Sequence, residues 1–202
     1  MWVLKLGGSW LKNRKLNDLL QRLILYNDSD IILVVGGGIF ADAVRLSQRF
    51  LKFDDKFANY LAIKATESYA ESINSIFPEI KLTKKLNEFK KKDGLKIWLP
   101  GETLKNERTF IKNWDSTSDS IACWLGKKIS AKGVIFVKSL NFETNQKYNL
   151  RDLQKRGILD ENISSYTNKN TCLKIVGPEI VINLRKFDNI SNYFTKLKRI
   201  EL

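Results

Sequence analysis

Residues 1–9 read Met-Trp-Val-Leu-Lys-Leu-Gly-Gly-Ser, and residues 31–38 read Ile-Ile-Leu-Val-Val-Gly-Gly-Gly. Each stretch is a short apolar run that ends at glycines, which is typical of a buried strand followed by a tight turn. Leucines at helical spacing over 14–26 separate the two strands, and a second helix is expected over 40–50. This βαβα order predicts a parallel sheet with helices on both faces.

The rest of the chain continues the alternation of helices and strands. We expect helices over 57–76, 121–129 and 150–157, and strands over 97–99 and 134–137. We also expect a helix break at 27–30, a basic surface connector over 81–93, a loop over 102–113 and a β-hairpin over 172–184. The sequence therefore predicts a single α/β domain over 1–202, a three-layer αβα sandwich with a mainly parallel open sheet.

The composition limits the chemistry that the chain can perform. It contains no histidine, which excludes catalytic triads with histidine, metal sites with histidine ligands and acid–base catalysis by an imidazole. Lys and Arg number 35 against 22 Asp and Glu, and the net charge of +13 suits anionic partners such as nucleotides and phosphorylated metabolites. No basic stripe is interleaved with aromatic residues, so we expect no nucleic-acid partner.

The two cysteines, Cys123 and Cys172, lie far apart and among apolar neighbours. They predict buried free thiols rather than a disulfide or a metal site, which fits a reducing cytoplasm. The first residues lack the pattern of a signal peptide, and no stretch approaches the length of a membrane span. We therefore expect a cytoplasmic protein without membrane contact.

Four motifs stand where an open α/β sheet binds its ligand, beyond the carboxyl ends of strands. Glycines let the backbone approach an anion and a lysine adds positive charge, although each motif alone could be a turn or a helix cap. Because parallel strands end at the same edge, the motifs together predict one anion-binding crevice. They are Lys5 with Gly7-Gly8-Ser9, then Gly36-Gly37-Gly38, then Thr117-Ser118-Asp119-Ser120, and Lys138-Ser139.

These motifs resemble those of the amino-acid kinase family, which includes aspartate, acetylglutamate, uridylate and isopentenyl-phosphate kinases. The similar stretches are 5–9, 34–40 and 117–122, and their order and rough spacing cover about residues 1–160. The resemblance implies the carbamate kinase-like fold of that family and an ATP-dependent transfer of a phosphoryl group. It also suggests a homo-oligomer, for which exposed apolar positions on 57–76 would be natural contacts.

A closer resemblance, over 36–45, 61–69 and 114–125, is to the short kinases of methanofuran-type cofactor biosynthesis. Members of that subgroup phosphorylate an aminomethylfuran-methanol phosphate to its diphosphate. Two hypotheses stay open beside this one. The chain could be a kinase of an amino acid or another carboxylate, or a non-catalytic nucleotide- or oxyanion-binding protein of the same fold.

By resemblance, Lys5 would lie at the transferred phosphoryl group, and Asp119 would orient Lys5 and help to position Mg²⁺ carried by ATP. The other phosphate and nucleotide contacts would come from Gly7, Gly8, Ser9, Thr117, Ser118, Ser120, Lys138 and Ser139. The acceptor substrate would contact Gly36, Gly37, Gly38 and Arg45. We expect an acceptor-binding half at about 1–112 and a nucleotide-binding half at about 113–202.

The chain departs from the family pattern after the strand at 134–137. Many members have an Asp-Gly turn there that helps to hold the nucleotide, whereas residues 139–143 read Ser-Leu-Asn-Phe-Glu. A later lysine in a Gly-Gly-Met-type segment is also missing, and Lys174 is a poor substitute because it lies inside an apolar run. These departures imply that the nucleotide half is reduced or rebuilt.

Overall fold

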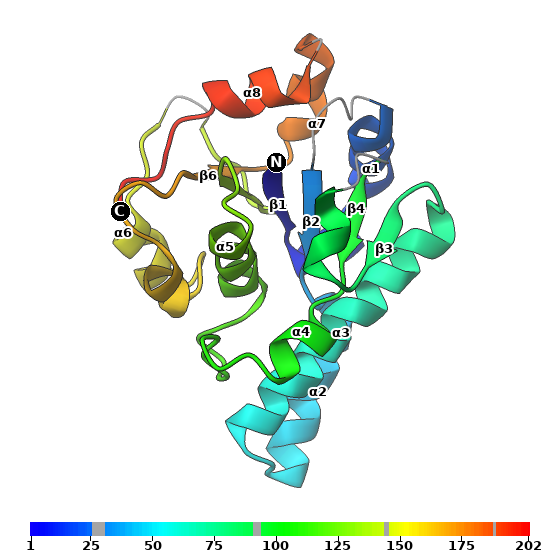
Figure 1. The fold of residues 1–202 in the computed structure, drawn as a ribbon, viewed down its shortest axis with the longest axis vertical. Helices are drawn as coiled ribbons and strands as arrows, with labels where there is room; N and C mark the ends of the chain where they lie inside the picture. The colour runs from blue at the N-terminus through cyan, green and yellow to red at the C-terminus, as the bar shows by residue number, and fades with distance from the viewer. Residues whose placement is uncertain (26–30, 91–93, 144–145, 188) are drawn as a thin grey trace.

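The computed structural model describes residues 1–25, 31–90, 94–143, 146–187 and 189–202. Six strands form one sheet in the order β3-β4-β2-β1-β5-β6, and every pair is parallel. The strands are β1 (Trp2–Leu6), β2 (Ile31–Val35), β3 (Lys81–Thr83), β4 (Lys96–Trp98), β5 (Val134–Val137) and β6 (Leu173–Val176). Helices cover both faces, so the predicted αβα sandwich is confirmed (Figure 1).

The structure contains the five predicted helices in order, as α1, α2, α3, α5 and α6, and adds α4, α7 and α8. The pair α2 and α3 extends beyond the carboxyl end of the sheet (Figure 1). The predicted break at 27–30 lies outside the described residues. Among the described residues, no helix is long and apolar enough to cross a membrane. The helices are α1 (Leu16–Leu25), α2 (Gly38–Leu51), α3 (Asp55–Ile76), α4 (Gly101–Lys105), α5 (Ser118–Lys128), α6 (Leu150–Lys155), α7 (Ile180–Asn183) and α8 (Ile190–Lys196), with 3₁₀ turns η1 (Gly8–Lys12), η2 (Leu86–Lys90), η3 (Glu161–Tyr166) and η4 (Leu184–Lys186).

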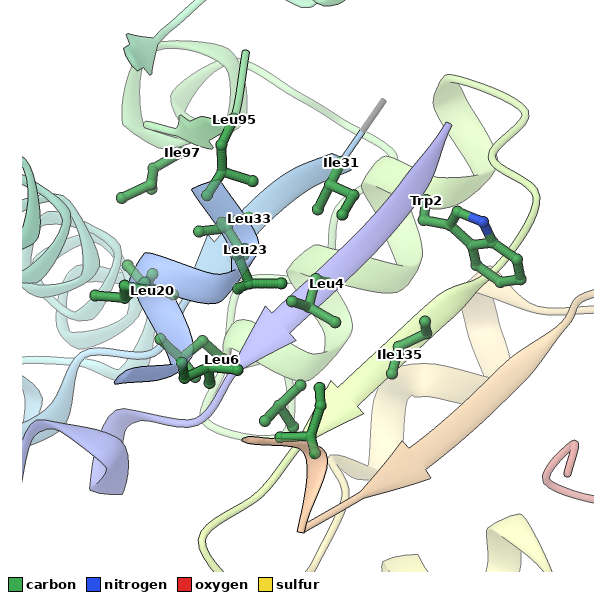
Figure 2. Close-up of a cluster of buried hydrophobic side chains, with 14 of the residues drawn as sticks. Trp2, Leu4, Leu6, Leu20, Leu23, Ile31, Leu33, Leu95, Ile97 and Ile135 are labelled. Atoms are coloured by element: carbon green, nitrogen blue, oxygen red, sulfur yellow. The ribbon is translucent and has the colours of Figure 1, made fainter. Parts of the chain in front are cut away.

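Alternating side chains divide the core into two layers on opposite faces of the sheet. Trp2, Leu4 and Leu6 of β1 belong to the layer that α1, α7 and α8 cover, part of which Figure 2 shows. Val3 belongs to the opposite layer, together with apolar residues of α5 and α6. Because Lys5 follows Val3 by two residues, the period of the strand directs its side chain toward α5.

The predicted β-hairpin over 172–184 is wrong. β6 pairs in parallel with β5, and the second apolar run forms the short helix α7. Glu179 Oε1 accepts a hydrogen bond from Gly177 N at 2.7 Å, and Ile180 N donates to Gly177 O at 3.2 Å. These bonds turn the chain into a helix, which buries Ile180 and Val181 against α1 and the sheet.

Two segments predicted to be irregular contain regular structure. The supposed loop at 102–113 begins inside α4, which buries Leu104 and whose Gly101 N donates to Glu67 Oε1 at 2.8 Å. The supposed connector at 81–93 contains the edge strand β3 and the turn η2, which buries Phe89. All three elements are too short to show a hydrophobic period in the sequence.

Candidate phosphate-binding site

Two glycine turns lie against each other at the carboxyl ends of β1 and β2. Gly7 N donates to the last residue of β5 and Gly36 N donates to the last residue of β1, both at 2.9 Å. A Cβ atom on Gly8 would lie only 2.4 Å from Gly38 N, and Gly38 itself has a φ of +52°. Glycine is required at both positions, because the two backbones approach more closely than side chains allow.

The carboxylate of Asp119, in the first turn of α5, bridges two lysines. Lys5 Nζ lies 2.9 Å from Asp119 Oδ1, and Lys138 Nζ lies 2.8 Å from Asp119 Oδ2. Lys5 comes from β1 and Lys138 from the end of β5, which are neighbouring strands. The family resemblance implied that Asp119 orients Lys5, and the structure adds Lys138 to the same carboxylate.

Burial sets the electrostatics of this trio. Lys5 and Asp119 are 4% and 3% exposed. Burial opposes ionisation of Asp119, but Lys5 and Lys138 outweigh it, so the pKa of Asp119 lies below its ordinary value. Burial and the charge of Lys5 lower the pKa of Lys138. The trio carries two positive charges and one negative charge, and this excess favours an anionic ligand.

The N-terminus of α5 is held by a carboxylate from a distant part of the chain. Asp160 accepts hydrogen bonds from Thr117 N and Thr117 Oγ1, both at 2.7 Å, and from Ser120 N at 3.0 Å. Burial and the nearby charge of Asp119 raise the pKa of Asp160. On its own, the Thr-Ser-Asp-Ser motif could have been a helix cap, whereas the carboxylate that caps α5 belongs to Asp160.

A cleft of about 570 Å³ opens over these groups. The predicted residues that line it are Lys5, Gly8, Ser9, Gly36, Gly37, Gly38, Arg45, Thr117, Ser118, Asp119 and Lys138. The three remaining predicted residues, Gly7, Ser120 and Ser139, adjoin this lining through hydrogen bonds. Gly7 is hydrogen-bonded to β5 and Ser120 to Asp160, and Ser139 Oγ lies 2.7 Å from Ser9 Oγ. The structure thus brings all four sequence motifs together at one edge of the sheet.

Arg45 lies at the rim of the cleft, against an aromatic ring. Its guanidinium carbon is 4.6 Å from the ring centroid of Trp114, and Nη1 lies 3.2 Å from Asp42 Oδ1. Trp114 Nε1 donates to Gln48 Oε1 at 2.8 Å, which ties the loop before α5 to α2. The cleft therefore has one wall that combines a cation with an aromatic face.

Sequence reasoning missed several cleft residues. Trp114 lies inside a stretch that carried the family resemblance, and its position before the Thr-Ser-Asp-Ser motif could have marked it. Asp160, Leu159 and Gln154 come from a segment with no recognisable motif, and all three line the cleft. Only the pairing of Asp160 with the N-terminus of α5, which is a tertiary contact, identifies its place in the site.

Groups that bind phosphates dominate this site, and metal ligands are scarce. Across the described part of the chain, His, Cys, Asp and Glu side chains form no group of three or more that could hold a metal ion. The glycine turns, the two lysines and the N-terminus of α2 form the donor set that phosphates take. α2 begins after Gly37, a residue that brings no capping side chain into the cleft.

The fold and the candidate site together fit an α/β phosphotransferase, because open parallel sheets typically bind their ligands at the carboxyl edge. A sequence model of the amino acid kinase family matches residues 1–142. The chain therefore belongs to the amino acid kinase family, and the resemblance seen in its motifs is confirmed.

Three known proteins that are similar to this chain are kinases. The [5-(aminomethyl)furan-3-yl]methyl phosphate kinase of Methanocaldococcus jannaschii is 30% identical over an alignment of 147 residues, which covers 70% of this chain and 67% of that protein. Uridylate kinase of Archaeoglobus fulgidus has a TM-score of 0.64 at 18% identity, covering 91% of this chain and 95% of its own. Aspartate kinase of Synechocystis has a TM-score of 0.62 at 10% identity, covering 88% of this chain and 38% of its own. These two structural likenesses show the fold.

Proposed function

We propose that this phosphotransferase transfers the γ-phosphoryl group of ATP to a phosphorylated aminomethylfuran alcohol, giving a diphosphate for a methanofuran-type cofactor. The observation that carries the proposal is the 30% identity with the Methanocaldococcus jannaschii kinase, because its aligned length covers 70% of this chain. In the reaction, an oxygen of the acceptor phosphate attacks the γ-phosphorus. The bond to the bridging oxygen breaks, and ADP leaves with the electron pair.

An acceptor of this kind suits a site without histidine. The second pKa of a phosphate monoester is about 6, so the attacking oxygen carries no proton at neutral pH. The protein then needs no general base, and its task is to hold two polyanions in line and to neutralise their charge. Lys5 and Lys138, held 2.9 and 2.8 Å from Asp119, are suited to that task.

We assign Lys5 to the transferred phosphoryl group and Lys138 to the nucleotide phosphates, with Asp119 holding both. Gly7, Gly8, Ser9, Thr117, Ser118, Ser120 and Ser139 would supply or support donors to the same phosphates. Mg²⁺ would arrive with ATP, bound mainly by phosphate oxygens near Asp119, and would neutralise part of their charge. This fits a site in which both oxygens of Asp119 are paired with lysines.

The acceptor would lie against Gly36, Gly37 and Gly38, where the N-terminus of α2 favours an anion. Arg45 would contact its phosphate from the rim. We assign the acceptor to residues 1–112 and the nucleotide to residues 113–202 of a single domain. The family match ends at residue 142, which is consistent with a rebuilt nucleotide half.

A homo-oligomer is also part of the proposal. On α3, Phe57 and Ile76 are exposed, and α2 adds Leu46, Phe50 and Leu51. A second copy covering these residues would remove a large apolar surface from water.

The two cysteines are free and buried, as the sequence predicted, which is consistent with the proposed reducing compartment.

ADP release with a panel of acceptors tests the function. The panel contains the furan alcohol phosphate, its dephosphorylated alcohol, and carboxylates such as aspartate and acetylglutamate. We expect turnover that needs both Mg²⁺ and the furan alcohol phosphate. The Lys5→Met variant is the matched negative control and should show no turnover. Turnover of a carboxylate with none of the furan phosphate would replace the proposed acceptor with the alternative.

A further inference from the structure

The segment after α6 binds both the loop before α5 and the first turn of α5, which contains Asp119. The carboxylate of Asp160 takes three hydrogen bonds from Thr117 and Ser120, and both of its oxygens are used. Two residues later, Asn162 N donates to Asp115 O at 3.1 Å, and Asn162 Nδ2 donates to Ser116 Oγ at 2.9 Å. One short segment therefore binds the chain on either side of the N-terminus of α5.

The segment is fixed to α6, and the loop that it binds is also held from α3. Gln154 Nε2 donates to the carbonyl oxygens of Asp160 and Glu161 at 2.9 and 2.8 Å, which fixes the segment against α6. From α3, Asn59 Nδ2 donates to the carbonyl oxygens of Asn113 and Ser116, both at 2.9 Å. The loop before α5 is thus held between two elements that are distant from it in the sequence.

We propose that Asp160 is a positioning residue for phosphoryl transfer: it caps α5 from a distance and so fixes Asp119 between Lys5 and Lys138. The proposal rests on the role assigned above to this trio. Asp160 lies beyond residue 142, where the family match ends, so the positioning contact comes from a part of the chain that the family model does not match.

The geometry of the trio explains why a cap would matter for turnover. Asp119 follows the N-cap residue Thr117 by two positions, so any shift of the first turn moves its carboxylate directly. Its two ion pairs, at 2.9 and 2.8 Å, leave little room for such a shift. A displacement of about 1 Å at a positioning group can cost about 100-fold in rate.

Asp160 also has an electrostatic effect that separates positioning from simple stability. The charged groups around Lys138 are Lys5 on β1, Asp119 on α5 and Asp160, and the two carboxylates favour its protonated form. Removing the Asp160 charge, or loosening Asp119, should lower the pKa of Lys138. A mutation that only destabilised the fold would leave that pKa unchanged in the folded protein.

Three variants of the full chain test the proposal: Asp160→Ala, Asp160→Asn and the control Asp152→Asn. Asp152 is exposed on α6, so the control removes the same charge from the neighbouring helix, away from the cleft. Turnover is measured with ATP, Mg²⁺ and the furan alcohol phosphate. The pKa of Lys138 is followed by NMR in protein with nitrogen-labelled lysine, and amide exchange at Thr117–Ser120 by mass spectrometry.

We expect Asp160→Ala to lower kcat by about 100-fold, with KM within about threefold of the parent. Asparagine caps helices about as well as aspartate, so Asp160→Asn should stay within about tenfold of the parent. Exchange at Thr117–Ser120 should rise most in Asp160→Ala, and the pKa of Lys138 should fall in both variants but not in the control.

Parent-like turnover in Asp160→Ala would overturn the proposal, as would an unchanged pKa of Lys138 in the two Asp160 variants. If Asp160→Ala fails to fold, Asp160→Asn and its effect on Lys138 decide. If the parent does not use the furan alcohol phosphate, that result counts against the proposed acceptor. The amide exchange and the pKa of Lys138 still decide the role of Asp160.

Discussion

Replacing Asp119 by asparagine keeps the size of the side chain and removes the charge that Lys5 and Lys138 share. In the parent, the carboxylate lies 2.9 and 2.8 Å from the two ammonium nitrogens, and it is 3% exposed. After the substitution, two ammonium groups remain near each other in a site with little water. We expect both the stability and the activity of the chain to fall.

The magnitude follows from these distances. At an effective dielectric constant of about 20, one such ion pair contributes about 6 kcal/mol of attraction, much of which desolvation offsets. Removing one partner of a buried pair typically costs about 3–5 kcal/mol. We therefore expect Asp119→Asn to lower the free energy of unfolding by about that amount and to abolish most turnover.

A double-mutant cycle measures whether the loss comes from the ion pairs. Lys138→Met removes one of the uncompensated charges, so Asp119→Asn should cost less in that background, with a coupling of about 1–3 kcal/mol. Urea unfolding at neutral pH, followed by tryptophan fluorescence, gives the four free energies. Additive effects within about 0.5 kcal/mol would refute the idea that Asp119 and Lys138 stabilise each other.

Other substitutions test separate parts of the site. Gly8→Ala should destabilise the chain by about 1–3 kcal/mol in thermal unfolding, because its Cβ would lie 2.4 Å from Gly38 N. Gly7→Ala, whose Cβ would come no closer than 3.3 Å, should cost less, and an equal cost would contradict the overlap argument. Lys5→Met should remove most turnover with only a small change in Tm, because Asp119 keeps its ion pair with Lys138. Substantial residual turnover would remove Lys5 from the mechanism. Burial lowers the pKa of Lys138, so its proton is lost at a lower pH than that of an ordinary lysine and activity should decline early on the alkaline side. Lys138→Arg, which stays protonated, should extend activity to higher pH, and a pH profile identical to that of the parent would exclude this proton loss.

The sequence could predict that the glycine turns lie at the same edge of the sheet as Lys5, Asp119 and Lys138. Lys5 and Lys138 stand at or near the ends of apolar runs that read as buried strands, and parallel strands end at the same edge. The period of the strand also sets the side of the sheet to which Lys5 points. A short-range pattern was therefore enough to place most of the site.

The rest depends on tertiary contacts that leave little local signal. Asp160 lies 43 residues after Thr117 and caps α5 through space, so no spacing rule connects the two. The helix α7 has four residues, which is too short for apolar spacing to distinguish it from a strand. Its conformation is set instead by the bond from Gly177 N to Glu179 and by burial of Ile180.

Phosphorus NMR of the product tests the central claim most directly. The parent is incubated with ATP, Mg²⁺ and the furan alcohol phosphate, and Lys5→Met is run beside it. We predict that the monoester signal is replaced by a pair of coupled diphosphate signals separate from the pair that ADP gives, in step with ADP formation, and that both changes are absent with Lys5→Met. ADP formation without the second coupled pair, or an unchanged monoester signal under conditions in which the protein binds ATP, would contradict the account.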